Sequence, residues 1–199
     1  MKKITCFLLV PFLFMVACSN KKSKEGITIK DEEGKEKLSV DISKAEDGLA
    51  KLQKMKDDLE KLTPLTTEEL TALVPGELMG ASRTNLDVNS AMGATVANAD
   101  YKINDSADLK LEIVDCAGAG GAGMFGMQYM NMIDVNSDDE DEYVKTIEFN
   151  GGKAFENCKK KRNRCTLAYF SGSRFLVSLR GDNVGIDALK EIAKGVKIK

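Results

Sequence analysis

The cysteines carry most of the chemistry that this sequence allows. The chain has five cysteines and no histidine. It therefore lacks the usual general base at neutral pH, the Ser–His and Cys–His nucleophile pairs, and the commonest zinc ligand. We predict no catalytic residue, no metal site and no cofactor. The thiols remain available for acylation, for a disulfide or for burial.

Cys18 stands at the end of a segment with the layout of an export signal. Lys2-Lys3 precedes a mostly apolar run from residue 4 to residue 17, which is short for a membrane span and contains Pro11. This series resembles the lipoprotein signal of bacterial envelope proteins, with Met15 where that pattern usually has leucine. The resemblance implies cleavage before Cys18 and acylation of that residue, with palmitate-type chains that hold the protein on a membrane. An ordinary cleaved signal or a short uncleaved anchor is the alternative.

The other exported cysteines are Cys116, Cys158 and Cys165, an odd number. Cys158 and Cys165 flank a basic turn and form a candidate disulfide. A two-residue turn at Lys161-Arg162 would make them a cross-strand pair. A three-residue turn with a left-handed Asn163 would leave them diagonal, and disulfide geometry tolerates little offset.

The segments before residue 65 form a tether, a hairpin and a helix. Residues 18–26 are polar and predict a flexible tether after a signal at 1–17. Within 27–64, apolar and polar residues alternate in two short runs around an Asp/Glu/Gly turn, which predicts a small hairpin. An amphipathic helix follows a Ser43–Glu46 capping box. Its apolar stripe recurs every three or four residues until Thr63-Pro64: Ala45, Leu49, Leu52, Met55, Leu59 and Leu62.

Residues 65–199 predict one α+β domain. A second capping box, Thr66 to Glu69, opens a short helix that ends at Pro75-Gly76. Beyond Arg83 the apolar period becomes two, and short turns join the later segments, so neighbouring strands are antiparallel. We expect an antiparallel sheet with flanking helices. The strands run near 95–103, 109–113, 143–150, 154–159, 164–170 and 174–180, with a last helix at 184–194.

Several of these residues form a pattern that resembles a family of uncharacterised bacterial envelope lipoproteins with a PsbP-like domain. The likeness covers roughly residues 45–199. It rests on Leu65-Thr66, Glu69-Leu70, Leu73-Val74-Pro75, Leu78, Gly80, Arg83-Thr84, Met92-Gly93, Ala99, Tyr101, Ile113-x-Asp115, Gly152-Lys153, Arg174-Phe175-Leu176-Val177 and Gly181. The resemblance implies a PsbP-like fold. It carries no active site with it, because these motifs are structural.

The segment from Gly118 to Gly123 matches G-x-G-x-x-G. A dinucleotide site also needs a parallel βαβ unit, whereas tight hairpins follow here, so we do not expect one. With the methionines and aromatics up to Ile133, the segment favours a helix packed closely on the sheet, because small residues allow close approach and thioethers fill irregular gaps. The alternative is an adaptable apolar surface for a protein, a lipid or an apolar ligand.

Two charged segments have ordinary explanations. Residues 134–142 begin like a calcium loop but have Asp139 where glycine is needed and Lys145 where glutamate is needed, which predicts a solvated acidic loop. The basic run 159–164 predicts an exposed hairpin tip, with anionic headgroup binding as the alternative, and the acidic loop and basic tip could face each other. The whole chain has 29 basic and 31 acidic residues, which argues against a nucleic-acid partner.

Together these features predict a lipid-anchored cell-envelope protein on the periplasmic or outer-membrane side. We expect a non-enzymatic binding or accessory module, attached to the membrane by its N-terminal lipid, with a protein or apolar ligand as candidate partner. The alternative is an envelope hydrolase or another enzyme with a histidine-free active site. The sequence has no G-x-S-x-G elbow to support that alternative.

Overall fold

The computed structural model describes residues 26–30, 36–131 and 135–198. Contacts divide the chain into two units, Met1–Asp47 and Gly48–Lys199. The boundary falls inside helix α1 (Ile42–Glu60), whereas the sequence places it near residue 64. Cys18 and the tether lie outside the described residues.

The first unit contains a β-hairpin at the positions that the alternation predicts. Strands β1 (Gly26–Lys30) and β2 (Glu36–Asp41) pair antiparallel, with Ile27 opposite Val40 and Ile29 opposite Leu38. Helix α1 follows β2 directly and continues into the second unit.

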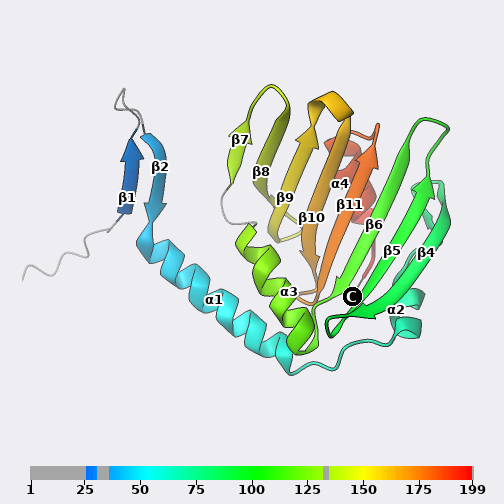
Figure 1. The fold of residues 1–199 in the computed structure, drawn as a ribbon, viewed down its shortest axis with the longest axis horizontal. Coiled ribbons are helices and arrows are strands. Elements are labelled where there is room, and N and C mark those ends of the chain that lie inside the picture. The colour runs from blue at the N-terminus through cyan, green and yellow to red at the C-terminus, as the bar shows by residue number, and fades with distance from the viewer. Residues whose placement is uncertain (1–25, 31–35, 132–134, 199) are drawn as a thin grey trace, which may run out of the picture. The chain divides into compact units, whose positions relative to one another are not determined.

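The second unit is built on a mostly antiparallel sheet, in which the described residues form nine strands (Figure 1). The strand order is β3-β4-β5-β6-β11-β10-β9-β8-β7. With its helices, the unit has the predicted α+β architecture. The strands are β3 (Glu77–Leu78), β4 (Ala81–Ala91), β5 (Ala94–Lys102), β6 (Asp108–Asp115), β7 (Asn136–Asp138), β8 (Glu142–Phe149), β9 (Gly152–Lys159), β10 (Arg164–Ser171) and β11 (Phe175–Asp182).

The chain contributes strands to the sheet in two consecutive series. Strands β3 to β6 form one antiparallel series, and helix α3 (Gly118–Asn131) then leads to the far edge at β7. Strands β7 to β11 return across the sheet until β11 pairs with β6, with Leu179 opposite Leu111. The centre of the sheet therefore joins strands that are about 70 residues apart in the sequence.

Helices cover both faces of the sheet (Figure 1). Helix α2 (Thr67–Leu73) and helix α4 (Ile186–Gly195) lie on one face, where alternate residues of the central strands form the main core. Lys190 of α4 also forms an ion pair with the buried Glu156 of β9, 2.6 Å from Nζ to Oε1. The main core includes Leu70, Tyr101, Leu109, Leu111, Ile113, Leu167, Tyr169, Val177, Leu179 and Leu189.

A smaller core lies on the opposite face, under α3 and the part of α1 that belongs to the second unit. Leu52 and Leu59 of α1 and Phe125 of α3 are buried against Val114 and Leu176 of the sheet. Leu49, which belongs to the same predicted stripe, is 52% exposed, so only part of the stripe packs on the domain.

Three strands were not predicted from the sequence. Strand β4 lies beside the two-residue edge strand β3, and its residues are mostly exposed and polar, so its apolar alternation is weak. Strand β7 lies in the segment predicted as an acidic loop, and its three residues are all exposed. Backbone pairing with β8 forms β7, and apolar pattern analysis cannot detect such a strand. Strand β3 has only two residues.

Candidate functional site

A polar groove lies on the sheet face that carries α3, beyond the part that α3 and α1 cover. Near one end of the strands this face is apolar, with Val114, Leu176 and Phe170 under the helices. Two residues further along the strands, the residues on the same face become polar, because side chains alternate between the two faces. The polar lining comes from four adjacent strands: Asn98 and Asp100 of β5, Lys110 and Glu112 of β6, Ser178 and Arg180 of β11, and Thr166 of β10.

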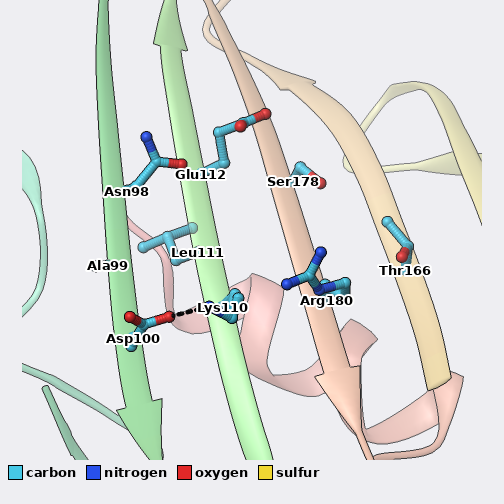
Figure 2. Close-up of a pocket in the computed structure, with 9 residues that line it drawn as sticks. All are labelled: Asn98, Ala99, Asp100, Lys110, Leu111, Glu112, Thr166, Ser178 and Arg180. Carbon is cyan, nitrogen blue, oxygen red and sulfur yellow. Dashed lines mark ion pairs between the residues drawn. The ribbon is translucent and has the colours of Figure 1, made fainter. Parts of the chain in front are cut away.

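The groove has a volume of about 420 Å³, and its lining residues lie side by side along the four strands (Figure 2). The strand register places Lys110 opposite both Asp100 and Arg180, and Thr166 opposite Arg180. Glu112 lies between Asn98 and Ser178 in the neighbouring row. The lining contains no aromatic residue, so the groove offers hydrogen bonds and charges to a ligand rather than stacking.

Two of the charged groups in the groove pair with each other. Lys110 Nζ lies 2.8 Å from Asp100 Oδ1, and the amide of Asn85 donates to the other oxygen of Asp100 at 3.3 Å. The hydrogen bond from Lys110 is the main reason that the pKa of Asp100 lies below its usual value. The lowered pKa keeps Asp100 ionised at neutral pH, and its charge balances that of Lys110 across the ion pair.

Arg180 differs from the paired Asp100 and Lys110 in its contacts. Its Nε is buried and has no hydrogen-bond partner in the part of the chain that the structure describes. In Figure 2 its guanidinium extends along β11 toward Ser178, whereas the carboxylate of Glu112 lies beyond Ser178 at the other end of the groove. A buried donor without a partner costs free energy, so this nitrogen is the strongest local indication of a ligand contact.

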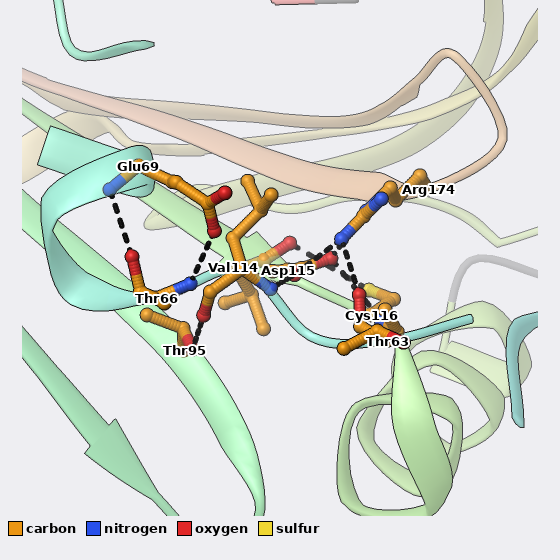
Figure 3. A network of polar contacts seen from close by, with 10 residues as sticks. Thr63, Thr66, Glu69, Thr95, Val114, Asp115, Cys116 and Arg174 are labelled. Carbon is orange, nitrogen blue, oxygen red and sulfur yellow. Dashed lines mark hydrogen bonds and ion pairs between the residues drawn. The ribbon is translucent and has the colours of Figure 1, made fainter. Parts of the chain in front are cut away.

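A second polar cluster lies at the end of the same strands and is structural (Figure 3). Asp115, whose side chain is fully buried, accepts two hydrogen bonds from Arg174, at 2.8 and 2.9 Å. It also accepts from the amides of Leu65 (2.7 Å) and Ala117 (3.2 Å). Burial alone would raise the pKa of Asp115, but these hydrogen bonds outweigh it and the pKa lies below its usual value.

The Asp115–Arg174 cluster fastens three segments to one another. Arg174 belongs to the turn between β10 and β11, and its Nη2 also donates to the carbonyl of Thr63, 3.0 Å away. The hydroxyl of Thr95 donates to the carbonyl of Leu65 at 2.6 Å. The link between α1 and α2 is thereby held against the ends of β5 and β6. With its hydrogen bonds inside the protein, Asp115 is placed to hold the fold rather than to bind a ligand.

The cysteines of the second unit have separate environments. Cys116 is buried, and burial raises the pKa of its thiol to about 12, so it is not a nucleophile at neutral pH. Cys158 and Cys165 lie directly opposite each other on β9 and β10 and are joined by a disulfide in the structure. The turn between them differs from both predicted turns. Four residues, Lys160 to Asn163, connect the last strand pair, and a left-handed Asn163 coexists with direct pairing.

We expect the Cys158–Cys165 bridge in the purified protein. Alkylation before reduction should then modify Cys116 but neither bridged cysteine, and only after the protein is unfolded, because Cys116 is buried. Reduction should release two further thiols. Intact mass and peptide mapping of the unfolded protein provide the measurement. If Cys158 or Cys165 is alkylated without reduction, the bridge is absent from the protein in solution.

The basic tip and the acidic segment contact each other. Lys160 Nζ lies 2.6 Å from Asp138 Oδ1, and Lys161 forms an ion pair with Asp141. Asp139 Oδ1 accepts hydrogen bonds from the amides of Asp141 and Glu142, both at 2.8 Å. These contacts weaken the headgroup-binding alternative, since two lysines of the tip already have acidic partners. No group of residues that could hold a metal ion occurs in the described ranges, and Asp134 lies outside them.

The glycine-rich segment forms the first part of α3 and packs closely on the sheet. A side chain at Gly120 would meet the carbonyl oxygen of Met92 at 2.1 Å, and one at Gly121 would meet the backbone of Cys116 at 2.5 Å. This close packing is the interpretation that the sequence favours. The strands around α3 pair antiparallel, so the parallel unit of a dinucleotide site is not formed.

The methionines of α3 are only partly buried. Phe125 is fully buried and Met124 packs against the smaller core, but Met127 and Met130 are 66% and 50% exposed. A single helix on a sheet can bury only one side, and the glycines bring that side against the backbone. The sequence showed an apolar segment without showing which side of it faces solvent.

Sequence reasoning missed the groove. Each polar residue of the lining occupies a polar position in a recognisable alternation, which was the available signal. Comparisons with protein-family models, with curated proteins and with solved structures found no match to this chain. None of the helices among the described residues is long and apolar enough to cross a membrane.

Proposed function

We propose that the chain is a lipid-anchored binding module of the cell envelope that holds a polar ligand in the groove across β5, β6, β11 and β10. The observation that carries the proposal is the buried Nε of Arg180, which has no partner among the described residues although it lies in an open, polar groove. We further propose that the α+β domain is PsbP-like and that acylation of Cys18 places it on the periplasmic or outer-membrane side.

The arrangement of the groove supports binding. A core of large apolar residues stabilises the opposite face of the same strands, so the strand positions are held without help from the polar face. Polar groups on rigid strands are preorganised for a ligand and lose little conformational entropy when it binds. The exposed Met127 and Met130 support a second role for α3, as a contact surface for a protein or an apolar ligand.

Occupancy of the groove can be tested by chemical footprinting of the full chain in mild detergent. Lys110 is half exposed within the groove, whereas Lys54 of α1 is 82% exposed outside it. Polar extract from the producing cell's envelope should slow acetylation of Lys110 and leave Lys54 unchanged. The Asn98→Trp variant fills the groove and should abolish this extract-dependent protection. The control Asn89→Trp changes an exposed asparagine of β4 outside the groove and should retain the protection.

The footprint also has outcomes that would refute the proposal. Equal acetylation of Lys110 with and without extract would show that the groove binds nothing from the envelope. Protection that persists in the Asn98→Trp variant would place the ligand elsewhere on the domain.

A further inference from the structure

A buried donor without a partner distinguishes Arg180 from the paired Asp100 and Lys110 of the groove. Lys110 is engaged by Asp100, and Asp182, the next residue of β11 on the same face as Arg180, is engaged by Arg164 at 2.6 Å. Arg180 Nε is buried and without a partner in the described part of the chain. Asp100 and Asp182 are therefore bound to other cations, and Nε of Arg180 is left without a partner among the described residues.

The neighbours of Arg180 favour an anion. Thr166 lies opposite Arg180 on β10, and Ser178 precedes it on the same face of β11, so two hydroxyl donors flank the guanidinium. Lys110 lies opposite Arg180 on β6, and its charge is balanced by Asp100, so Arg180 carries the excess positive charge of this row. Glu112 is one row away along the strands, and its carboxylate lies at the far end of the groove (Figure 2).

We propose that Arg180, flanked by the hydroxyls of Thr166 and Ser178, binds an oxyanion group of the ligand that enters the groove. The guanidinium presents paired N–H donors in a fixed fork that matches the oxygens of a carboxylate or a phosphate. The ligand class is therefore a polar molecule with an anionic group and without an aromatic ring to stack. This inference rests on the proposed function, because it names the ligand class of the same groove.

The test follows the N–H resonance of Arg180 Nε by NMR in the full chain in detergent. The probes are inorganic phosphate and glucuronate at constant ionic strength, with glucose as the neutral control. Either anion should shift the Arg180 resonance in a saturable way, and the anion that binds more tightly distinguishes a phosphate source from a carboxylate source. Arg180→Met should weaken binding, followed by the amide signals of Thr166 and Ser178, about tenfold or more.

Two further variants separate a specific site from general charge attraction. Arg162→Met removes the same charge from the exposed basic tip and should leave the affinity unchanged. Glu112→Gln removes a negative charge from the groove and should tighten anion binding. An Arg180 resonance that does not respond to either anion in the unmodified protein would overturn the inference, whether or not Arg180→Met folds. If glucose shifts the amide signals of the groove while the Arg180 Nε resonance stays unchanged, the oxyanion inference is also overturned. The proposed function, binding of a polar ligand in the groove, would then still hold.

Discussion

Replacing Arg174 with leucine is expected to lower the free energy of unfolding by about 3–5 kcal/mol, because it leaves the carboxylate of Asp115 charged, fully buried and without its cation. Two hydrogen bonds to Asp115 and one to Thr63 are lost together, so the link between α1 and α2 also loses its hydrogen bond to Arg174. Urea unfolding of the variant and the unmodified protein provides the measurement.

The control for this prediction is Arg162→Leu, which removes an equal charge from the exposed tip and should change stability by less than about 0.5 kcal/mol. Arg174→Lys should fall between the two, since a lysine retains the charge but cannot form the two-pronged contact. A loss below about 1 kcal/mol in Arg174→Leu would show that the Asp115–Arg174 cluster does not hold the fold.

The same cluster sets the direction of a pH effect. Because the pKa of Asp115 in the folded protein lies below its usual value, its ionised form stabilises the fold. That contribution is complete above the unfolded-state pKa of about 3.9 and is lost as the pH falls through the lower folded pKa. The stability difference between the unmodified protein and Asp115→Asn should therefore be constant near neutral pH and shrink below about pH 4.

The strands of the sheet could largely be predicted from the sequence, and their arrangement could not. Alternation located β5, β6 and β8 to β11 because one side of each strand is buried in a core. The order of the strands depends on β11 returning to pair with β6, which no local pattern encodes. Asn98 and Arg180 line the same groove only because β11 pairs with β6, so the candidate site could not be predicted from the sequence.

The Asp115–Arg174 cluster could also be predicted only in part from the sequence. Asp115 and Arg174 both belong to motifs that we interpreted as structural from the sequence. It could not show that they meet, because 59 residues separate them. The exposures of Leu49 and Met127 were also beyond the sequence, since an apolar stripe is equally compatible with burial and with an unpartnered surface.

The proposal that the protein acts at a membrane surface through a lipid on Cys18 depends on residues outside the described part of the chain. Replacing Cys18 with serine removes the thiol that would carry an acyl chain. Because two or more acyl chains give stable attachment to a membrane, losing them through this single change should release the protein.

Fractionation of the producing cell tests this most directly, with an alkaline wash of the membranes and labelling by a palmitate analogue. We predict that the unmodified protein and the control Cys6→Ser remain in the washed pellet and carry the label, whereas Cys18→Ser is unlabelled and leaves the pellet. Retention of Cys18→Ser in the washed membranes would contradict the account, because the protein would then be held there by something other than a lipid on Cys18.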